Sequence, residues 1–187
     1  MTLARTLLVA LMMAGCSRTE TPAPEVKPAA SAAVATTAAT RKQLAEGDPA
    51  PAIDLTLHDG RKLSLASLKG KDVVVYFYPK DKTQGCTVEA QGVRDQWAEF
   101  QKAGVEVIGV SGQDAASHQA FIADEKLPFP LAVDTDGQVA RAFGVPMRGD
   151  IAARQTFLIG KDGRIKKIWR QVTPQNHAAE ILTAARS

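Results

Sequence analysis

An uninterrupted run of β-branched and aromatic residues, Val-Val-Val-Tyr-Phe-Tyr at 73–78, limits most strongly the folds open to this chain. Such a run without a polar residue is typical of a strand buried on both faces of a sheet. Pro79 ends the run, because proline has no N–H to donate to a neighbouring strand. A strand covered on both faces needs elements packed on each side, so we expect an α/β fold with this strand at its centre.

The segments around this strand predict a central mixed β-sheet flanked by helices. Asp-Gly pairs at 59–60 and 162–163 favour tight turns and predict two hairpins, one of them at the N-terminal end of the domain. Further buried strands are expected at 105–110 and 131–133, and a short turn at 67–70. Helices are expected at 87–102, which Gly104 ends, and at 138–143. Two further helices are expected to begin after the capping residues Asp114 and Asn176.

The first fifteen residues predict a targeting segment. Arg5 precedes an apolar run at 7–14, and eight residues are too few to cross a membrane core that needs about 20. Ala14 and Gly15 directly precede Cys16, and this arrangement resembles the lipobox of bacterial lipoproteins. The resemblance implies a signal peptide over 1–15 and a lipid attached to Cys16. The alternative is an ordinary secretory signal with an incidental cysteine.

The residues after Cys16 predict a location and a linker. Ser17 stands where lipoproteins kept in the inner membrane usually carry Asp, so the resemblance implies export to the bacterial envelope, facing the periplasm from the outer membrane. Residues 16–45 are rich in Pro, Ala and Thr and hold no aromatic residue, which predicts a disordered linker. The folded domain is expected over 46–187.

Charge and composition exclude several classes of function. The net charge of +3 comes wholly from residues 1–45, because residues 46–187 hold eighteen Lys or Arg and eighteen Asp or Glu, so no nucleic-acid partner is expected. Two cysteines cannot form a disulfide-rich scaffold. His58, His118 and His177 are not spaced as metal ligands, and we expect all three at the surface, with no metal and no cofactor.

Cys86 lies between the central strand and the following helix. A helix N-terminus carries partial positive charge and free N–H groups, which favour the nucleophilic thiolate. Gly85 lets the backbone approach closely at this point. The structural alternative is that Cys86 is a small buried apolar residue. An unpaired thiol in an oxidising compartment, next to polar neighbours, argues against that alternative.

The octapeptide Pro-Lys-Asp-Lys-Thr-Gln-Gly-Cys at 79–86 fits the Pro-x-x-x-Thr-x-x-Cys motif of peroxiredoxins. The longer run 77–90 resembles their Q-type subgroup, the bacterioferritin comigratory proteins, and the similarity extends over roughly 140 residues from Gly47 onward. The resemblance implies a thioredoxin-like fold. It also implies that Cys86 is the peroxidatic cysteine, which attacks hydrogen peroxide or an organic hydroperoxide, becomes a sulfenic acid and releases water or an alcohol.

The same resemblance implies roles around the thiol. Thr83 would contact peroxide and thiolate through its hydroxyl, and Pro79 would shield the pocket and fix the loop. Backbone N–H groups around Gly85 would hold the developing charge. Arg154 matches the distant arginine of the family and would stabilise the thiolate and orient the peroxide. Glu89 would either cap the helix or orient Arg154.

Recycling of the oxidised cysteine departs from the subgroup pattern. Many Q-type enzymes carry a resolving cysteine five residues after the first, but Gln91 occupies that position here, so no resolving cysteine is expected in the domain. This implies a one-cysteine enzyme whose sulfenic acid is reduced by an external thiol, such as a thioredoxin-like protein, glutathione or a second copy of the chain. We expect a monomer or a weak dimer.

Other functions remain to be weighed against the peroxidase. A thiol–disulfide oxidoreductase is disfavoured, because it would carry Cys-x-x-Cys and Glu89 stands three residues after Cys86. A copper chaperone would need two clustered cysteines and a histidine. A non-enzymatic lipoprotein of the same fold, which binds or senses through Cys86, stays open. Peroxide consumption in excess dithiothreitol distinguishes this alternative from the peroxidase, because a sensor would be oxidised only once.

Overall fold

The computed structural model describes residues 43–187. The predicted signal peptide, the lipid attachment at Cys16 and all but the end of the predicted linker lie outside the described residues. Within the described part, no helix is both long enough and apolar enough to cross a membrane.

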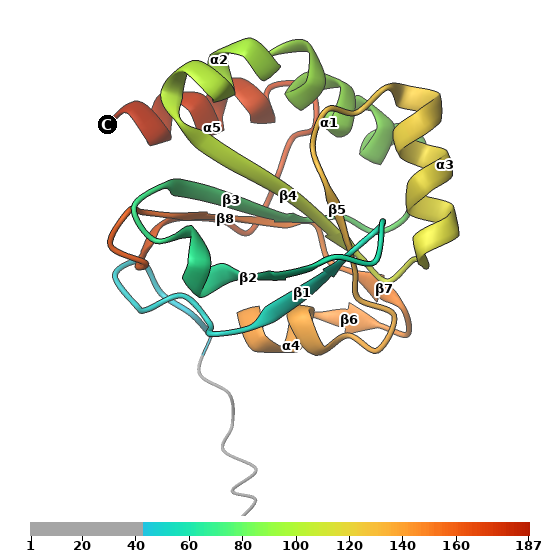
Figure 1. Cartoon of the computed structure of the whole chain (residues 1–187), viewed down its shortest axis with the longest axis horizontal. Helices are drawn as coiled ribbons and strands as arrows, with labels where there is room; N and C mark the ends of the chain where they lie inside the picture. The colour runs from blue at the N-terminus through green and yellow to red at the C-terminus, as the bar shows by residue number, and fades with distance from the viewer. Residues whose placement is uncertain (1–42) are drawn as a thin grey trace, which may run out of the picture. The chain divides into compact units, whose positions relative to one another are not determined.

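Within residues 43–187, seven strands form one mixed sheet in the order β2-β1-β5-β4-β3-β8-β9 (Figure 1). Strand β3 is parallel to β4 on one side and antiparallel to β8 on the other. All residues of β3 are buried, as the run of β-branched and aromatic side chains predicts. The strands are β1 (Asp54–Leu57), β2 (Lys62–Ser64), β3 (Asp72–Phe77), β4 (Val105–Ser111), β5 (Leu131–Val133), β8 (Gln155–Ile159) and β9 (Ile165–Trp169).

Helices cover both faces of the sheet, which confirms the predicted α/β architecture (Figure 1). One face carries α1 (Gln84–Asp95), α2 (Trp97–Ala103), α3 (Ala115–Glu125) and α5 (His177–Arg186). The other carries α4 (Gln138–Phe143) and the small hairpin of β6 (Met147–Arg148) and β7 (Ile151–Ala152). Side chains of β3 alternate between the two cores, so that Val74 and Tyr76 pack on the first side and Val75 and Phe77 on the second.

Several local predictions need correction. The helix expected over 87–102 is broken at Gln96, whose backbone leaves the helical range and separates α1 from α2. The turn expected at 67–70 overlaps a short 3-10 helix, η1 (Leu65–Leu68). The hairpin of β6 and β7 was not expected, because two-residue strands are too short to show a period. Asp114 caps α3 through the N–H of Ser117, whereas the side chain of Asn176 makes no cap bond to α5.

Candidate active site

Cys86 lies in the first turn of α1, just beyond the carboxyl end of β3. The extended backbone of Thr83 forms the N-cap, and the helix begins at Gln84. The first N–H groups of an α-helix have no acceptor within the helix, and its N-terminus carries partial positive charge. The sulfur therefore lies at the end of the helix where a negative charge is stabilised.

Arg154 reaches Cys86 from a distant part of the chain. Its Nη2 donates to Sγ of Cys86 at 3.2 Å, and its Nη1 donates to Oε2 of Glu89. Arg154 directly precedes β8, and the pairing of Phe77 with Gln155 carries it to the carboxyl end of β3. The structure thus brings the predicted arginine and the predicted nucleophile together.

Glu89 lies one helical turn after Cys86, with a relative exposure of 1%. Burial raises its pKa to about 7, although the charge and the hydrogen bond of Arg154 act in the opposite direction. Burial also acts to lower the pKa of Arg154, but the neighbouring Glu89 and Cys86 outweigh burial and raise that pKa. The guanidinium therefore stays charged. Of the two roles expected for Glu89, the contacts favour orientation of Arg154.

Thr83 and Pro79 lie in the loop between β3 and α1, three and seven residues before Cys86. The hydroxyl of Thr83 donates to the carbonyl of Lys80 at 3.0 Å, which leaves its oxygen able to accept a further hydrogen bond. Pro79 lies two residues after the end of β3 and is half-buried. A Cβ at Gly85 would lie 3.2 Å from Nη2 of Arg154, which shows how closely the guanidinium approaches the helix backbone.

Access to the sulfur is narrow. Cys86 has a relative exposure of 1%, whereas Thr83 and Gln84 beside it are exposed. The side chain of Arg154 keeps 18% of its surface exposed. The exposed start of α1 is the nearest accessible surface to the sulfur in sequence, and a large reactant would need the loop or the first helical turn to move.

Two of the three histidines are buried, contrary to the prediction from the sequence. The expectation that all three are surface residues is wrong for His118 and His177, whose relative exposures are 0% and 1%. Nδ1 of His118 lies 2.9 Å from Oδ2 of Asp81, and Nε2 of His177 lies 2.7 Å from the hydroxyl of Thr156. Hydropathy alone treats histidine as polar and does not show that such partners exist. Among residues 43–187, no group of three possible ligands is arranged to hold a metal ion.

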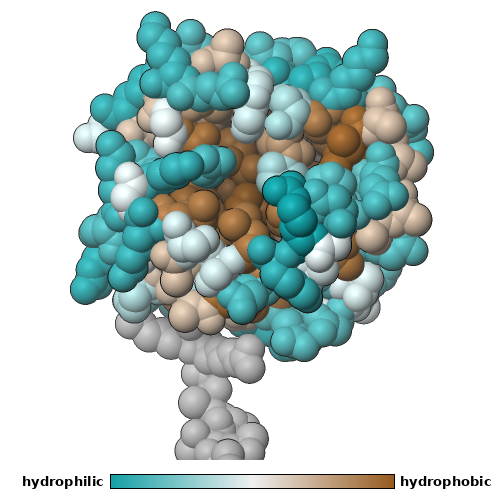
Figure 2. Space-filling model, viewed as in Figure 1, coloured by the Kyte–Doolittle hydropathy of each residue, from teal (hydrophilic) through white to brown (hydrophobic). Residues whose placement is uncertain are grey.

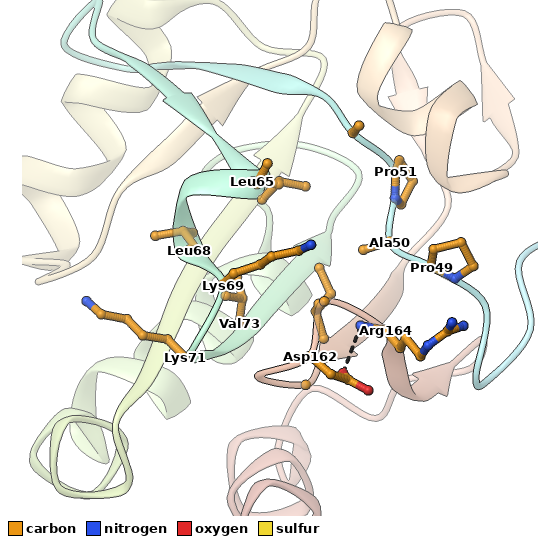
Figure 3. Close-up of a pocket in the computed structure, with 15 residues that line it drawn as sticks. Pro49, Ala50, Pro51, Leu65, Leu68, Lys69, Lys71, Val73, Asp162 and Arg164 are labelled. Carbon is orange, nitrogen blue, oxygen red and sulfur yellow. Dashed lines mark hydrogen bonds between the residues drawn. The ribbon is translucent and has the colours of Figure 1, made fainter.

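The structure also has a cavity with both apolar and charged lining residues at the other end of β3. On the face of the domain seen in Figure 1, Figure 2 shows apolar residues in a hollow that hydrophilic residues surround. A cavity of about 310 Å³ is lined by Leu65, Leu68 and Val73, and the side chain of Lys69 extends across it (Figure 3). Val73 lies near the start of β3, whereas Cys86 follows the end of that strand. This cavity is therefore separate from the thiol.

Comparisons with known proteins found relatives of this chain. The model of the AhpC/TSA family matches residues 46–168. The chloroplastic peroxiredoxin Q of Oryza sativa subsp. japonica is 42% identical over 177 residues, which cover 91% of this chain and 80% of the rice protein. A Coxiella burnetii protein named as a peroxiredoxin of the bcp type is 42% identical over 143 residues, 73% of this chain and 95% of its own.

A solved structure extends the likeness to the fold. It is that of the Xanthomonas campestris bacterioferritin comigratory protein, in a study of that protein's alkyl peroxide reduction activity. Its TM-score is 0.70 at 33% identity, over 76% of this chain and 98% of the other. The predicted thioredoxin-like fold is confirmed by this match.

The comparisons contradict the location predicted from residues 1–17. The rice relative is named as chloroplastic, and neither it nor the Coxiella burnetii relative is named as an outer-membrane lipoprotein. The predicted location in the bacterial envelope, facing the periplasm from the outer membrane, is therefore wrong. The prediction depended on a short apolar run and a few small residues before one cysteine, a pattern with little physical constraint.

Proposed function

The chain belongs to the AhpC/TSA family, as its peroxiredoxin relatives indicate. From this membership we propose that it is a thiol peroxidase that acts through Cys86 alone. The proposed substrates are hydrogen peroxide and organic hydroperoxides, and the proposed role is antioxidant defence. The observation that carries the proposal is the 3.2 Å contact between the guanidinium of Arg154 and Sγ of Cys86 at the N-terminus of α1.

The proposed reaction has two halves. In the first, the thiolate of Cys86 attacks one peroxide oxygen, so that an S–O bond forms and the O–O bond breaks. The sulfur loses two electrons and becomes a sulfenic acid, and the other oxygen takes a proton and leaves as water or an alcohol. In the second, one external thiol forms a mixed disulfide with release of water, and another regenerates Cys86 as the external disulfide leaves.

Each neighbour of Cys86 has a physical role in the first half. Arg154 carries a permanent charge in a largely buried position, where it stabilises both the thiolate and the negative charge that develops as the O–O bond breaks. Thr83 accepts from the peroxide O–H and helps to orient it. Glu89 fixes the guanidinium from its other side.

The absence of a second cysteine in the domain supports reduction by an external thiol. Within residues 43–187, Cys86 is the only cysteine. At Gln91, where many Q-type enzymes carry a resolving cysteine, the side-chain amide donates to Oε2 of Glu125 on α3 at 2.8 Å. We propose a thioredoxin-like protein or a small thiol such as glutathione as the reductant. Because the sulfur is covered, a protein reductant needs the start of α1 to open.

Steady-state peroxide consumption tests the proposal. A Cys16→Ser variant leaves Cys86 as the only thiol, and it is mixed with hydrogen peroxide and excess dithiothreitol. We expect many equivalents of peroxide to be consumed per chain, and none above background after a further Cys86→Ser change. Consumption of a single equivalent would contradict a peroxidase and favour the redox sensor. Loss of turnover caused by Cys16→Ser itself would contradict the one-cysteine cycle.

A further inference from the structure

A buried polar cluster joins the loop before α1 to helix α3, and the reaction described above does not use it. Its centre is the carboxylate of Asp81, with a relative exposure of 5%. Oδ1 accepts from the hydroxyl of Tyr78 at 2.7 Å, and Oδ2 accepts from the hydroxyl of Ser117 at 2.6 Å. Nδ1 of His118 lies 2.9 Å from the same Oδ2. The loop residue thus contacts Tyr78, directly after β3, and two neighbouring residues of α3.

The contacts of His118 determine its charge. Its Nδ1 faces the carboxylate of Asp81, and its Nε2 lies 3.2 Å from the carbonyl oxygen of Ala132 on β5. Both partners only accept, and a neutral imidazole has a single N–H, so one of the two contacts would set a lone pair against an oxygen. Only the imidazolium donates to both. The ring is fully buried, so an imidazolium at this position would form a buried ion pair with Asp81.

The ionised state of Asp81 agrees with this assignment. Burial acts to raise its pKa, but the hydrogen bonds from His118, Ser117 and Tyr78 outweigh burial and hold that pKa below its ordinary value. The titratable side chains that contact the ring of His118 are Asp81 and Tyr78. From α3, the carbonyl of Asp114 accepts the backbone N–H of His118 while the Asp114 carboxylate caps Ser117.

The cluster lies within the segment that shapes the site. Asp81 is two residues from both Pro79 and Thr83, and the helix that carries Cys86 begins directly after Thr83. Lys82, the residue after Asp81, has a left-handed backbone with φ of 59°, a conformation that costs free energy in any residue with a side chain. Its ammonium pairs with Asp124 of α3 at 2.7 Å, but both side chains are about half exposed, so this pair contributes little. Of the two contacts between this loop and α3, the buried one is therefore the stronger anchor.

We propose that His118 is a positioning residue for the peroxidase reaction, because its imidazolium holds Asp81 and thereby keeps Thr83 and the first turn of α1 in place around Cys86. The inference rests on the proposed function. Loss of the positive charge leaves a buried carboxylate without its counter-charge, and such a carboxylate is stabilised when the loop opens to water. A neutral residue at 118 should therefore displace Thr83 and slow the oxidation of Cys86.

Nuclear magnetic resonance of the unmutated chain tests the charge directly. With ¹⁵N-labelled histidine at pH 7.5, we expect both ring nitrogens of His118 to carry a proton. A signal from one protonated and one unprotonated ring nitrogen would overturn the ion pair. This measurement needs no activity and no variant that might unfold the domain, so it tests the pair even if the peroxidase proposal fails.

Kinetics test the effect on Cys86. In the Cys16→Ser background, the second-order rate constant of Cys86 oxidation by hydrogen peroxide is measured from pH 5 to pH 9 for His118→Gln, Asp81→Asn and the double variant. The control is His58→Gln, at a half-buried histidine next to the β1–β2 turn. We expect each single variant to lose about tenfold at neutral pH, the double variant to lose less than the product of the two, and the control to be unchanged.

The pH profile separates positioning from a merely structural role. If His118 positions the site, the pH profile of His118→Gln should differ from that of the parent, whereas the profile of His58→Gln should match it. A folded His118→Gln variant with the parent's rate constant and profile would overturn the inference while the peroxidase remained. A parent that does not turn over peroxide would instead overturn the proposed function.

Discussion

Nη2 of Arg154 donates to Sγ of Cys86 at 3.2 Å, although 68 positions separate the two residues in the chain. The contact follows from the sheet. Strand β8 runs antiparallel beside β3, and the pairing of Phe77 with Gln155 brings residue 154 to the end of β3 where α1 begins. Two segments far apart in sequence thus place a fixed positive charge against the one thiol of the domain.

Replacement of Arg154 tests that charge. In Arg154→Lys, one ammonium replaces a fork that binds Glu89 and Cys86 at once, so both contacts cannot be kept. We expect the rate constant for oxidation of Cys86 by hydrogen peroxide to fall by about 10²-fold. Arg164→Lys is the control, because Arg164 is exposed and its guanidinium bonds the carbonyl of Gly47. Equal rate constants for the two variants would exclude a special role for the fork.

Two glycines of α1 give a matched pair of alanine variants. A Cβ at Gly85 would lie 3.2 Å from Nη2 of Arg154, whereas at Gly92 the nearest atom, Cβ of Ala178, lies at an ordinary 3.8 Å. We expect Gly85→Ala to displace the guanidinium and slow Cys86 oxidation without unfolding the domain. Gly92→Ala should retain activity and gain up to about 1 kcal/mol from helix propensity. Chemical denaturation and stopped-flow oxidation measure both effects, and full activity in Gly85→Ala would contradict the close approach.

The raised pKa of Glu89 predicts a pH dependence of stability. Its pKa rises from 4.5 to about 7 on folding, mainly through burial. Between these values the native state binds more protons than the unfolded state, so the free energy of unfolding should fall as pH rises from about 4.5 to about 7. Glu89→Gln should lack this decrease, while Glu99→Gln, at a half-exposed surface ion pair, should keep it. Urea denaturation at several pH values measures the slopes, and identical slopes would show that burial does not control this carboxyl.

Much of the architecture could be predicted because its signals are local. The apolar run at β3 and the Asp-Gly turns depend on residues adjacent in sequence, and so does the cap at Asp114. The break at Gln96 and the two-residue strands β6 and β7 depend on tertiary packing, which no short window contains.

The site divides in the same way. Cys86 and Thr83 belong to one short motif and were predicted from it. Arg154 was predicted as a site residue only from the family resemblance, because an arginine at a strand end is usually solvated. The pair of Asp81 and His118 was missed entirely. Its two members are 37 positions apart, and nothing in either local pattern shows that the side chains turn inward to meet.

The central claim is that the fold makes Cys86 reactive toward peroxides. It is tested most directly by the rate at which one equivalent of hydrogen peroxide adds a single oxygen to Cys86, followed by mass spectrometry in the Cys16→Ser variant. The native chain is compared with the same chain unfolded in urea at the same pH. We expect the native thiol to react at least about 10²-fold faster, because Arg154 and the N-terminus of α1 act only in the folded state. Equal rates in the native and unfolded chains would contradict the account.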